Sequence, residues 1–153
     1  MKALELKIPP PVYALSLGIV MWLLNQYFPL VRFIESPWNK IGMAIIAIAI
    51  VLDSSSLFLF LKKRTTINPM KPTNTEGLVT AGLYKITRNP MYVGLLVILF
   101  GYAIWLGSLT PFLILPVFYW LITSMQIKPE ERILEKKFGE EYLDYKNKVK
   151  RWL

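Results

Sequence analysis

An uncharged run of 37 residues, from Met91 to Ile127, constrains this chain more than any other feature. A helix needs about 20 residues to cross the bilayer core, so the run is too long for one span and about right for two. Gly107 and Pro111 predict a turn within it, with Pro111 near the start of the second helix. Residues 11–28 carry no charge, and residues 41–61 carry one, Asp53. We therefore predict four transmembrane helices, near residues 11–28, 41–61, 91–106 and 110–127.

The basic residues fall mostly on one side of these spans. Of the 18 Lys and Arg residues, 16 lie before the first span, between the second and third, or after the fourth. Because basic residues favour the cytoplasmic side, both termini are predicted to be cytoplasmic. The net charge of +8 is then an orientation signal, and no nucleic-acid partner is predicted. No small-residue cleavage site follows the first span, so we expect a retained anchor rather than a signal peptide.

Two cytoplasmic segments complete the expected fold, a loop over residues 62–90 and a tail over residues 128–153. Helix-breaking residues are spread through the loop, at Asn68-Pro69, Lys71-Pro72 and Gly77. In the tail, Pro129 suits the first turn of a helix and Gly139 interrupts it. Four apolar residues then recur at helical spacing and predict a stripe that lies on the membrane surface or docks on the loop: Tyr142, Tyr145, Val149 and Trp152.

The expected fold is thus one all-α integral membrane domain over residues 1–153, with amphipathic helices at its carboxyl end. Its composition limits the chemistry, because the chain has no Cys and no His. Thiol catalysis, Cys-ligated zinc and iron–sulfur clusters are excluded, and the commonest general base is missing. Acid–base work falls to Asp, Glu, Lys or Tyr, and we predict no metal site.

The first candidate site covers residues 82–94, where the long loop meets the third span. Pro90 presets the start of a helix, whose free N–H groups attract anions, and Arg88 offers a fork for a carboxylate or phosphate. Tyr84 and Tyr92 supply aromatic faces for a cation, and Gly94 allows close approach to the backbone. The same residues also suit an ordinary interface, with a positive-inside Arg and belt tyrosines.

The second candidate site is acidic and follows the fourth span. Glu130 and Glu131 stand in the first turn of the predicted tail helix, and Glu140 and Glu141 follow Gly139. Paired carboxylates beside a membrane can hold ribose hydroxyls, offset a cationic cofactor or act as a base, and their spacing does not choose among these roles. The alternative is a solvated helix face.

Asp53 is the third point of interest, because a carboxylate inside a span is costly and is often functional. Three serines follow it, so a polar contact between helices is the structural alternative. Both roles stay open.

The two clusters occur in a recognisable order. The first reads Gly82-x-Tyr84-x-x-Thr87-Arg88-Asn89-Pro90-Met91-Tyr92-x-Gly94, and two predicted spans separate it from the second. The second reads Pro129-Glu130-Glu131-Arg132-x-Leu134-Glu135-x-x-Phe138-Gly139-x-Glu141-Tyr142-x-x-Tyr145. Together they resemble the isoprenylcysteine carboxyl methyltransferase and phospholipid methyltransferase superfamily, over roughly Ile41 to Leu153. This resemblance implies an integral membrane methyltransferase that uses S-adenosylmethionine and a lipid-like acceptor taken from the bilayer.

The resemblance also implies site residues at matching positions. The cofactor-binding set is Tyr84, Arg88, Asn89, Pro90, Tyr92, Gly94, Glu130 and Glu131, and the candidate bases are Glu131, Glu130 and Tyr92. Many members have His where this chain has Asn89, which cannot act as a base near neutral pH. Isoprenylcysteine enzymes place an Arg before the Glu pair, where this chain has Lys128, and this weakens the case for a prenylcysteine carboxylate as the acceptor.

Methyl transfer fits the composition, because displacement at a sulfonium needs orientation and electrostatics more than a metal or thiol. A carboxylate acceptor needs no base, whereas an amine or hydroxyl acceptor needs one. A membrane reductase that uses NADPH is an alternative, since sterol reductases share a related architecture, although they generally have more spans. A non-enzymatic membrane assembly protein is the third possibility. The sequence has no Gly-x-Gly-x-x-Gly motif, which disfavours a soluble Rossmann enzyme.

Overall fold

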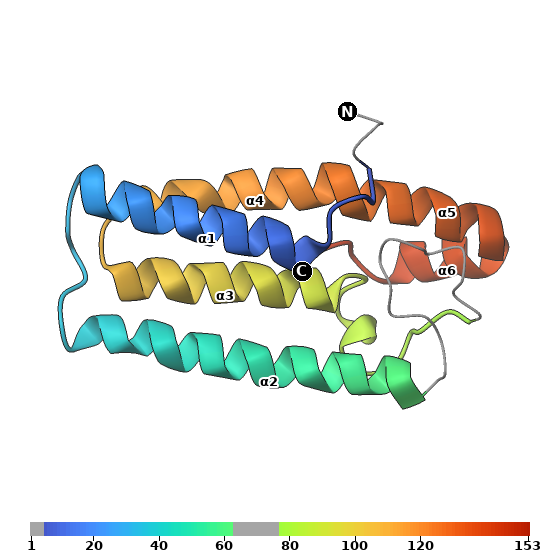
Figure 1. Ribbon diagram of the computed structural model, residues 1–153. Coiled ribbons are helices and arrows are strands. Elements are labelled where there is room, and N and C mark those ends of the chain that lie inside the picture. The colour runs from blue at the N-terminus through green and yellow to red at the C-terminus, as the bar shows by residue number, and fades with distance from the viewer. Residues whose placement is uncertain (1–4, 63–76) are drawn as a thin grey trace.

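The computed structural model describes residues 5–62 and 77–153, and it shows four long helices, each of which runs antiparallel to the helix before it in the chain (Figure 1). They are α1 (Pro10–Tyr27), α2 (Ile41–Lys62), α3 (Pro90–Leu106) and a fourth, continuous helix over Thr110–Phe138. The fourth consists of a 3₁₀ turn (η5, Thr110–Leu113), α4 (Ile114–Ile122), a π-helical turn (η6, Thr123–Ile127) and α5 (Lys128–Phe138). In the described ranges, regular structure is helical apart from two isolated β-bridges.

The four predicted segments are confirmed as helices, with ends that differ by a residue or so, except that the fourth helix continues beyond Ile127 into α5. The described residues contain one helix, Thr110–Phe138, that is long and apolar enough to cross a membrane. Pro90–Leu106 is a shorter apolar helix. Two short 3₁₀ turns, Trp38–Lys40 and Gly82–Lys85, precede α2 and α3.

Proline and glycine set the helix ends where the sequence predicts them. Pro90 occupies the first turn of α3, where a missing N–H costs nothing. Pro129 instead follows the π-helical turn inside the continuous fourth helix, and the Met125 carbonyl four residues before it accepts a hydrogen bond from the Leu6 amide. Gly107 ends α3 with a φ of 81°, and a methyl group there would lie 2.3 Å from the Ile34 carbonyl oxygen. Gly139, with a φ of 52°, separates α5 from α6 (Glu140–Lys148).

The helices α2 and α3 pack closely because glycines face each other. A methyl group at Gly42 would lie 2.2 Å from the Gly101 carbonyl oxygen and 2.7 Å from the Trp105 nitrogen. Small residues at helix contacts let backbones approach in this way. A buried cluster joins α1, α3 and α4, with Met21, Leu99, Phe118 and Ile122 fully or almost fully covered. The four helices therefore form one bundle that positions both candidate sites.

The bundle places the basic segments at one end. Residues 5–9, 77–89 and 128–153 lie at that end, and residues 28–40 and 107–109 lie at the other (Figure 1). At the first end the Leu6 amide donates to the Met125 carbonyl at 3.1 Å, and Gln126 Nε2 donates to the Ile8 carbonyl at 2.7 Å. At the opposite end Ser108 Oγ donates to Asn25 Oδ1 at 2.6 Å, and both residues are buried. Polar contacts thus hold the connections at both ends of the helices.

The predicted helical stripe in the tail is only half right. Tyr142 and Tyr145 are buried on α6, but the helix ends at Lys148 and Val149 is extended, with φ −123° and ψ 133°. An extended backbone lets Lys150 pair with Thr87 in a β-bridge, which a continuing helix would prevent. The helix breaks expected at Asn68-Pro69 and Lys71-Pro72 lie outside the described residues.

Candidate functional site

The carboxyl-terminal segment crosses the start of α3 and is tied to it by backbone hydrogen bonds. The Arg88 amide donates to the Lys150 carbonyl at 2.9 Å. The Arg151 carbonyl accepts two bonds, from Thr87 Oγ1 at 3.1 Å and from Asn89 Nδ2 at 2.8 Å. Asn89 stands at the cap position of α3, yet its side chain bonds this segment rather than the helix. The end of the chain is therefore part of the site.

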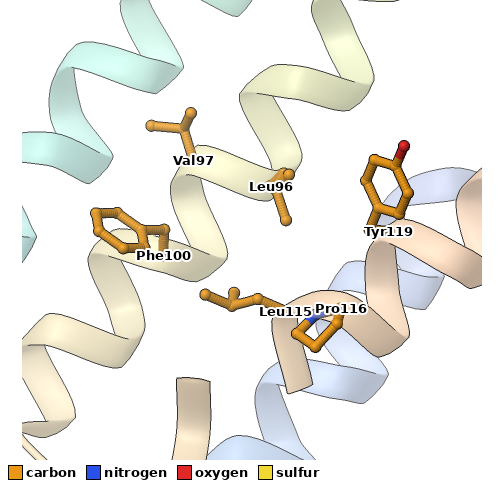
Figure 2. A pocket seen from close by; sticks show the side chains of 6 residues that line it. All are labelled: Leu96, Val97, Phe100, Leu115, Pro116 and Tyr119. Carbon is orange, nitrogen blue, oxygen red and sulfur yellow. The ribbon is translucent and has the colours of Figure 1, made fainter. Parts of the chain in front are cut away.

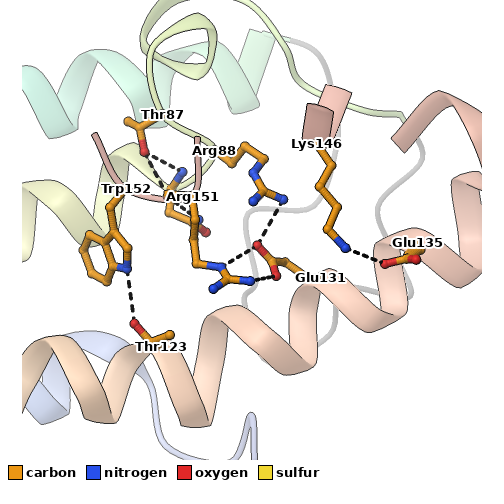
Figure 3. Close-up of polar contacts among 9 residues, drawn as sticks. Thr87, Arg88, Thr123, Glu131, Glu135, Lys146, Arg151 and Trp152 are labelled. Carbon is orange, nitrogen blue, oxygen red and sulfur yellow. Dashed lines mark hydrogen bonds and ion pairs between the residues drawn. The ribbon is translucent and has the colours of Figure 1, made fainter. Parts of the chain in front are cut away.

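Glu131, at the start of α5, lies between two guanidinium groups (Figure 3). Arg88 Nη1 lies 3.1 Å from Glu131 Oε1, and each of these side chains is 8% exposed. Arg151 binds the same carboxylate through both of its ends, with Nε 2.9 Å from Oε1 and Nη2 2.7 Å from Oε2. A buried carboxylate needs such partners, and the bidentate pair is the strongest form. Glu131 thus links the two candidate sites and the carboxyl terminus.

Glu130 makes the second link between the two sites. Tyr92, in the first turn of α3, donates its hydroxyl to Glu130 Oε1 at 2.5 Å. Burial raises the pKa of the Glu130 carboxyl to about 8, against the lowering effect of the Tyr92 hydrogen bond and with a further rise from the Glu131 carboxylate. Glu130 therefore binds its proton near neutral pH, as a group that can exchange a proton in catalysis does.

Three buried tyrosines lie on the segment before α3 and on α6. The Tyr145 hydroxyl donates to the Tyr84 carbonyl at 2.7 Å, so the tail docks on the segment before α3. This is one of the two placements that the sequence left open. Burial and, to a smaller extent, the Glu131 carboxylate raise the pKa of Tyr142 to about 12, against the lowering effect of the Arg88 guanidinium, so its phenol stays neutral. Tyr84, Tyr142 and Tyr145 are all buried.

Asp53 reaches this region from α2. Its carboxylate lies against Gly94, where an added methyl group would stand 1.9 Å from Asp53 Oδ1 and 2.1 Å from Oδ2. No described residue donates a hydrogen bond to this half-buried carboxylate. Ser54 donates to the Ile50 carbonyl of its own helix at 2.7 Å. The space beside Gly94, which the sequence assigns to a ligand, is thus filled by Asp53.

The structure brings most of the predicted site residues together. Contacts join Arg88 to Glu131, Tyr92 to Glu130, and Gly94 to Asp53, while Pro90 is buried as the first residue of α3. Sequence reasoning missed Arg151 and Trp152. Trp152 Nε1 donates to Thr123 Oγ1 at 3.2 Å, and its ring lies 4.8 Å from that of Tyr119. In the sequence Arg151 is one of several basic residues of the tail, and no pattern marks it as the partner of Glu131.

Comparison with known proteins decides the family. Residues 38–141 match the phospholipid methyltransferase family, and this range holds the first motif, the two helices after it and the second motif as far as Glu141. The chain belongs to the phospholipid methyltransferase family. The matched range includes Arg88, Tyr92, Glu130 and Glu131, and it ends before Arg151.

Individual relatives agree with the family assignment. An uncharacterized protein of Haemophilus influenzae is 48% identical over 63 residues, which are 41% of this chain and all of that protein. The protein-S-isoprenylcysteine O-methyltransferase of Schizosaccharomyces pombe is 29% identical over 78% of this chain and 51% of its own length. The enzyme of that name from Mus musculus is 29% identical over 90% of this chain and 48% of its own length. The chain thus spans about half the length of these two methyltransferases. No solved structure matches it.

Proposed function

We propose that this protein transfers a methyl group from S-adenosylmethionine to a lipid-like acceptor at the cytoplasmic face of a membrane. The observation that carries the proposal is the pair of links between the start of α3 and the start of α5. Arg88 pairs with Glu131 at 3.1 Å and Tyr92 bonds Glu130 at 2.5 Å, so the two motifs of a methyltransferase family form one site. This site lies at the end of the bundle where the basic segments gather.

The residues at the site fit the methyl donor chemically. Arg88 is 8% exposed, and its Nε and Nη1 have no hydrogen-bond partner in the described part of the chain, so they suit an acidic group of a ligand. Tyrosine faces suit a sulfonium cation. The proposed donor site comprises Tyr84, Arg88, Asn89, Pro90, Tyr92, Glu130 and Glu131, without Gly94, whose open side Asp53 fills. When bound, S-adenosylmethionine supplies an electrophilic methyl group, and these side chains orient it.

An apolar groove supports a lipid-like acceptor. It holds about 410 Å³ and is lined by Leu96, Val97 and Phe100 of α3 and by Leu115, Pro116 and Tyr119 of α4 (Figure 2). Tyr119 lies at its edge, and the Tyr119 ring contacts Trp152, the neighbour of Arg151. An acceptor whose hydrocarbon chain lies in this groove has moved out of the bulk lipid to a place next to the polar site. The acceptor's chemical class stays open among phospholipid amine, prenylated thioether carboxylate, isoprenoid and small amphiphile.

Glu130 is the proposed base where the acceptor is an amine or a hydroxyl. Its carboxyl must be ionised to take a proton, so the rate is expected to rise with pH to a plateau, with a midpoint near 8. Because this carboxyl is neutral in the folded protein and ionised in the unfolded chain, the free energy of unfolding is expected to fall between pH 4.5 and about 8.

The pH–rate profile is the measurement for this role, made with labelled methyl donor and detergent-purified protein. Glu130→Gln is expected to lower the rate at pH 9 by about 100-fold, within the usual range for a lost general base, and to remove the rise. An unchanged rise in Glu130→Gln would assign the titration to another group.

The four-helix arrangement supports a four-span topology with both termini in the cytoplasm. Arg32 and Lys40 are then on the far side, together with the Gly107 turn. Reporter fusions at Asn39 and at the carboxyl terminus are expected to report opposite sides. A cytoplasmic signal at Asn39 would overturn this topology.

Ligand binding by the detergent-purified protein tests the function as a whole. The wild-type protein is expected to bind S-adenosylmethionine and its demethylated product, and to bind NADPH much more weakly. Transfer of labelled methyl from the donor into a lipid extract is the matching activity assay. Binding of NADPH with no binding of either methyl-donor compound would replace the methyltransferase by a reductase.

A further inference from the structure

The ion-pair cluster at Glu131 holds one more positive charge than negative charge. Arg88 and Arg151 both contact the single Glu131 carboxylate. The neighbouring Glu130 is engaged with the Tyr92 hydroxyl and not with either guanidinium group. Among the described residues the cluster therefore has a spare positive charge in a place where two of its three side chains are 8% exposed. Buried charge of this kind calls for a counter-charge.

Arg88 also has donors to spare. Its Nη1 lies close to Glu131 Oε1 but without hydrogen-bond alignment, and its Nε–H has no acceptor among the described residues. An unpaired buried donor is costly, and the planar guanidinium fork matches a carboxylate or a phosphate. The spare charge and the spare donors thus lie on the same side chain and indicate the same kind of ligand, an oxyanion.

Arg151 is held in its place rather than lying loosely on the surface. Its carbonyl takes hydrogen bonds from Thr87 and Asn89, and the next residue, Trp152, is fixed by Thr123 and Tyr119. The side chain then meets both oxygens of Glu131 at 2.9 and 2.7 Å (Figure 3). Arg151 by itself gives both oxygens of the Glu131 carboxylate a hydrogen-bond donor. The donors of Arg88 are therefore left for a second acidic group, one that belongs to a ligand.

We propose that Arg88 and Arg151, joined through Glu131, form the subsite for the carboxylate of the methyl donor's amino-acid part. Arg88 contacts this carboxylate, and Arg151 is a positioning residue that neutralises Glu131 and holds Arg88 free. This inference rests on the proposed use of S-adenosylmethionine. It extends the site to the last residues of the chain, beyond the range that matches the family.

A comparison of S-adenosylmethionine with decarboxylated S-adenosylmethionine isolates the carboxylate. The full-length, detergent-purified wild-type protein is expected to bind the first at least about tenfold more tightly, as for a charge-assisted hydrogen bond. Arg151→Gln is expected to weaken binding of S-adenosylmethionine by about tenfold and to leave the decarboxylated compound within about twofold. Arg151→Lys, which keeps the charge but not the fork, is expected to fall between the two.

The matched control is Arg132→Gln, because Arg132 also pairs with a glutamate, Glu5, but is 59% exposed and outside the site. It is expected to change neither affinity. Equal weakening of both compounds in Arg151→Gln would make Arg151 a structural residue only and would overturn the proposal. A change in the affinity for phospholipid vesicles alone would assign the subsite to an acceptor phosphate and would also overturn it. If Arg151→Gln does not fold, the wild-type protein and Arg151→Lys provide the test. Equal affinity of either protein for the two compounds would also overturn the proposal. Failure of the wild-type protein to bind either compound would instead refute the proposal that S-adenosylmethionine is the methyl donor.

Discussion

Glu131→Gln is expected to abolish binding of S-adenosylmethionine, with a loss of at least about 100-fold, and to destabilise the protein. The carboxylate is 8% exposed and pairs with both Arg88 and Arg151, so a neutral amide leaves two guanidinium groups without their counter-charge. Loss of one partner from a buried ion pair costs about 3–5 kcal/mol. The repulsion between Arg88 and Arg151 is then unopposed, and we expect the carboxyl-terminal segment to move away from the start of α3.

Donor affinity and thermal unfolding in detergent are the two measurements for this variant. Glu135→Gln is the matched control, since Glu135 lies one turn further along α5 and pairs with Lys146 at 3.1 Å. These side chains are 42% and 34% exposed, and a pair of this kind contributes about 1 kcal/mol or less. Donor binding by Glu131→Gln at the wild-type level would show that the site assignment is wrong even though the family is right.

The helices were predictable because a long run of residues without charged side chains can satisfy its backbone hydrogen bonds in few ways other than a helix. Residues 91–127 had to form helices that bury their backbone groups, and Gly107 and Pro111 fixed the turn between them. The continuation of the fourth helix into α5 was not predictable from hydropathy. Polar Lys128 follows the apolar run there without a break in the helical backbone, because a π-helical turn precedes Pro129 and the Met125 carbonyl accepts a hydrogen bond from the Leu6 amide.

The site was predictable as two motifs but not as a set of contacts. The order of Arg88, Tyr92, Glu130 and Glu131 along the chain indicated a methyltransferase family, and the structure pairs Arg88 with Glu131 and Tyr92 with Glu130. Helical periodicity placed Trp152 on a continuing helix, because Tyr142 and Tyr145 share its spacing. The hydrogen bonds from the start of α3 to the Lys150 and Arg151 carbonyls are long-range, and no local pattern encodes them.

Gly94→Ala is expected to be the most disruptive glycine substitution near the site. Its methyl group would stand 1.9 Å from Asp53 Oδ1 and 2.2 Å from Asp53 Cγ, so α2 and α3 must move apart or the carboxylate must turn away. Overpacking of this kind costs about 1–3 kcal/mol. Because Gly94 follows Tyr92 by two residues, we expect the shift to lengthen the Tyr92–Glu130 hydrogen bond and to lower methyl transfer. Gly18→Ala is the matched control, since its methyl group would meet Leu99 Cδ2 at 3.9 Å, an ordinary contact.

A double-mutant cycle with Asp53→Ala identifies the cause and also tests the role of Asp53. If the clash is the cause, the double variant recovers most of the stability that Gly94→Ala loses, with a coupling of about 1–3 kcal/mol in thermal or denaturant unfolding. Simple additivity of the two changes would contradict the contact between Asp53 and Gly94. Methyl transfer by Asp53→Ala alone then separates the two roles that the sequence left open. Wild-type activity makes Asp53 a packing residue, whereas lost activity in a stable protein makes this carboxylate, half-buried beside Gly94, part of the acceptor's site.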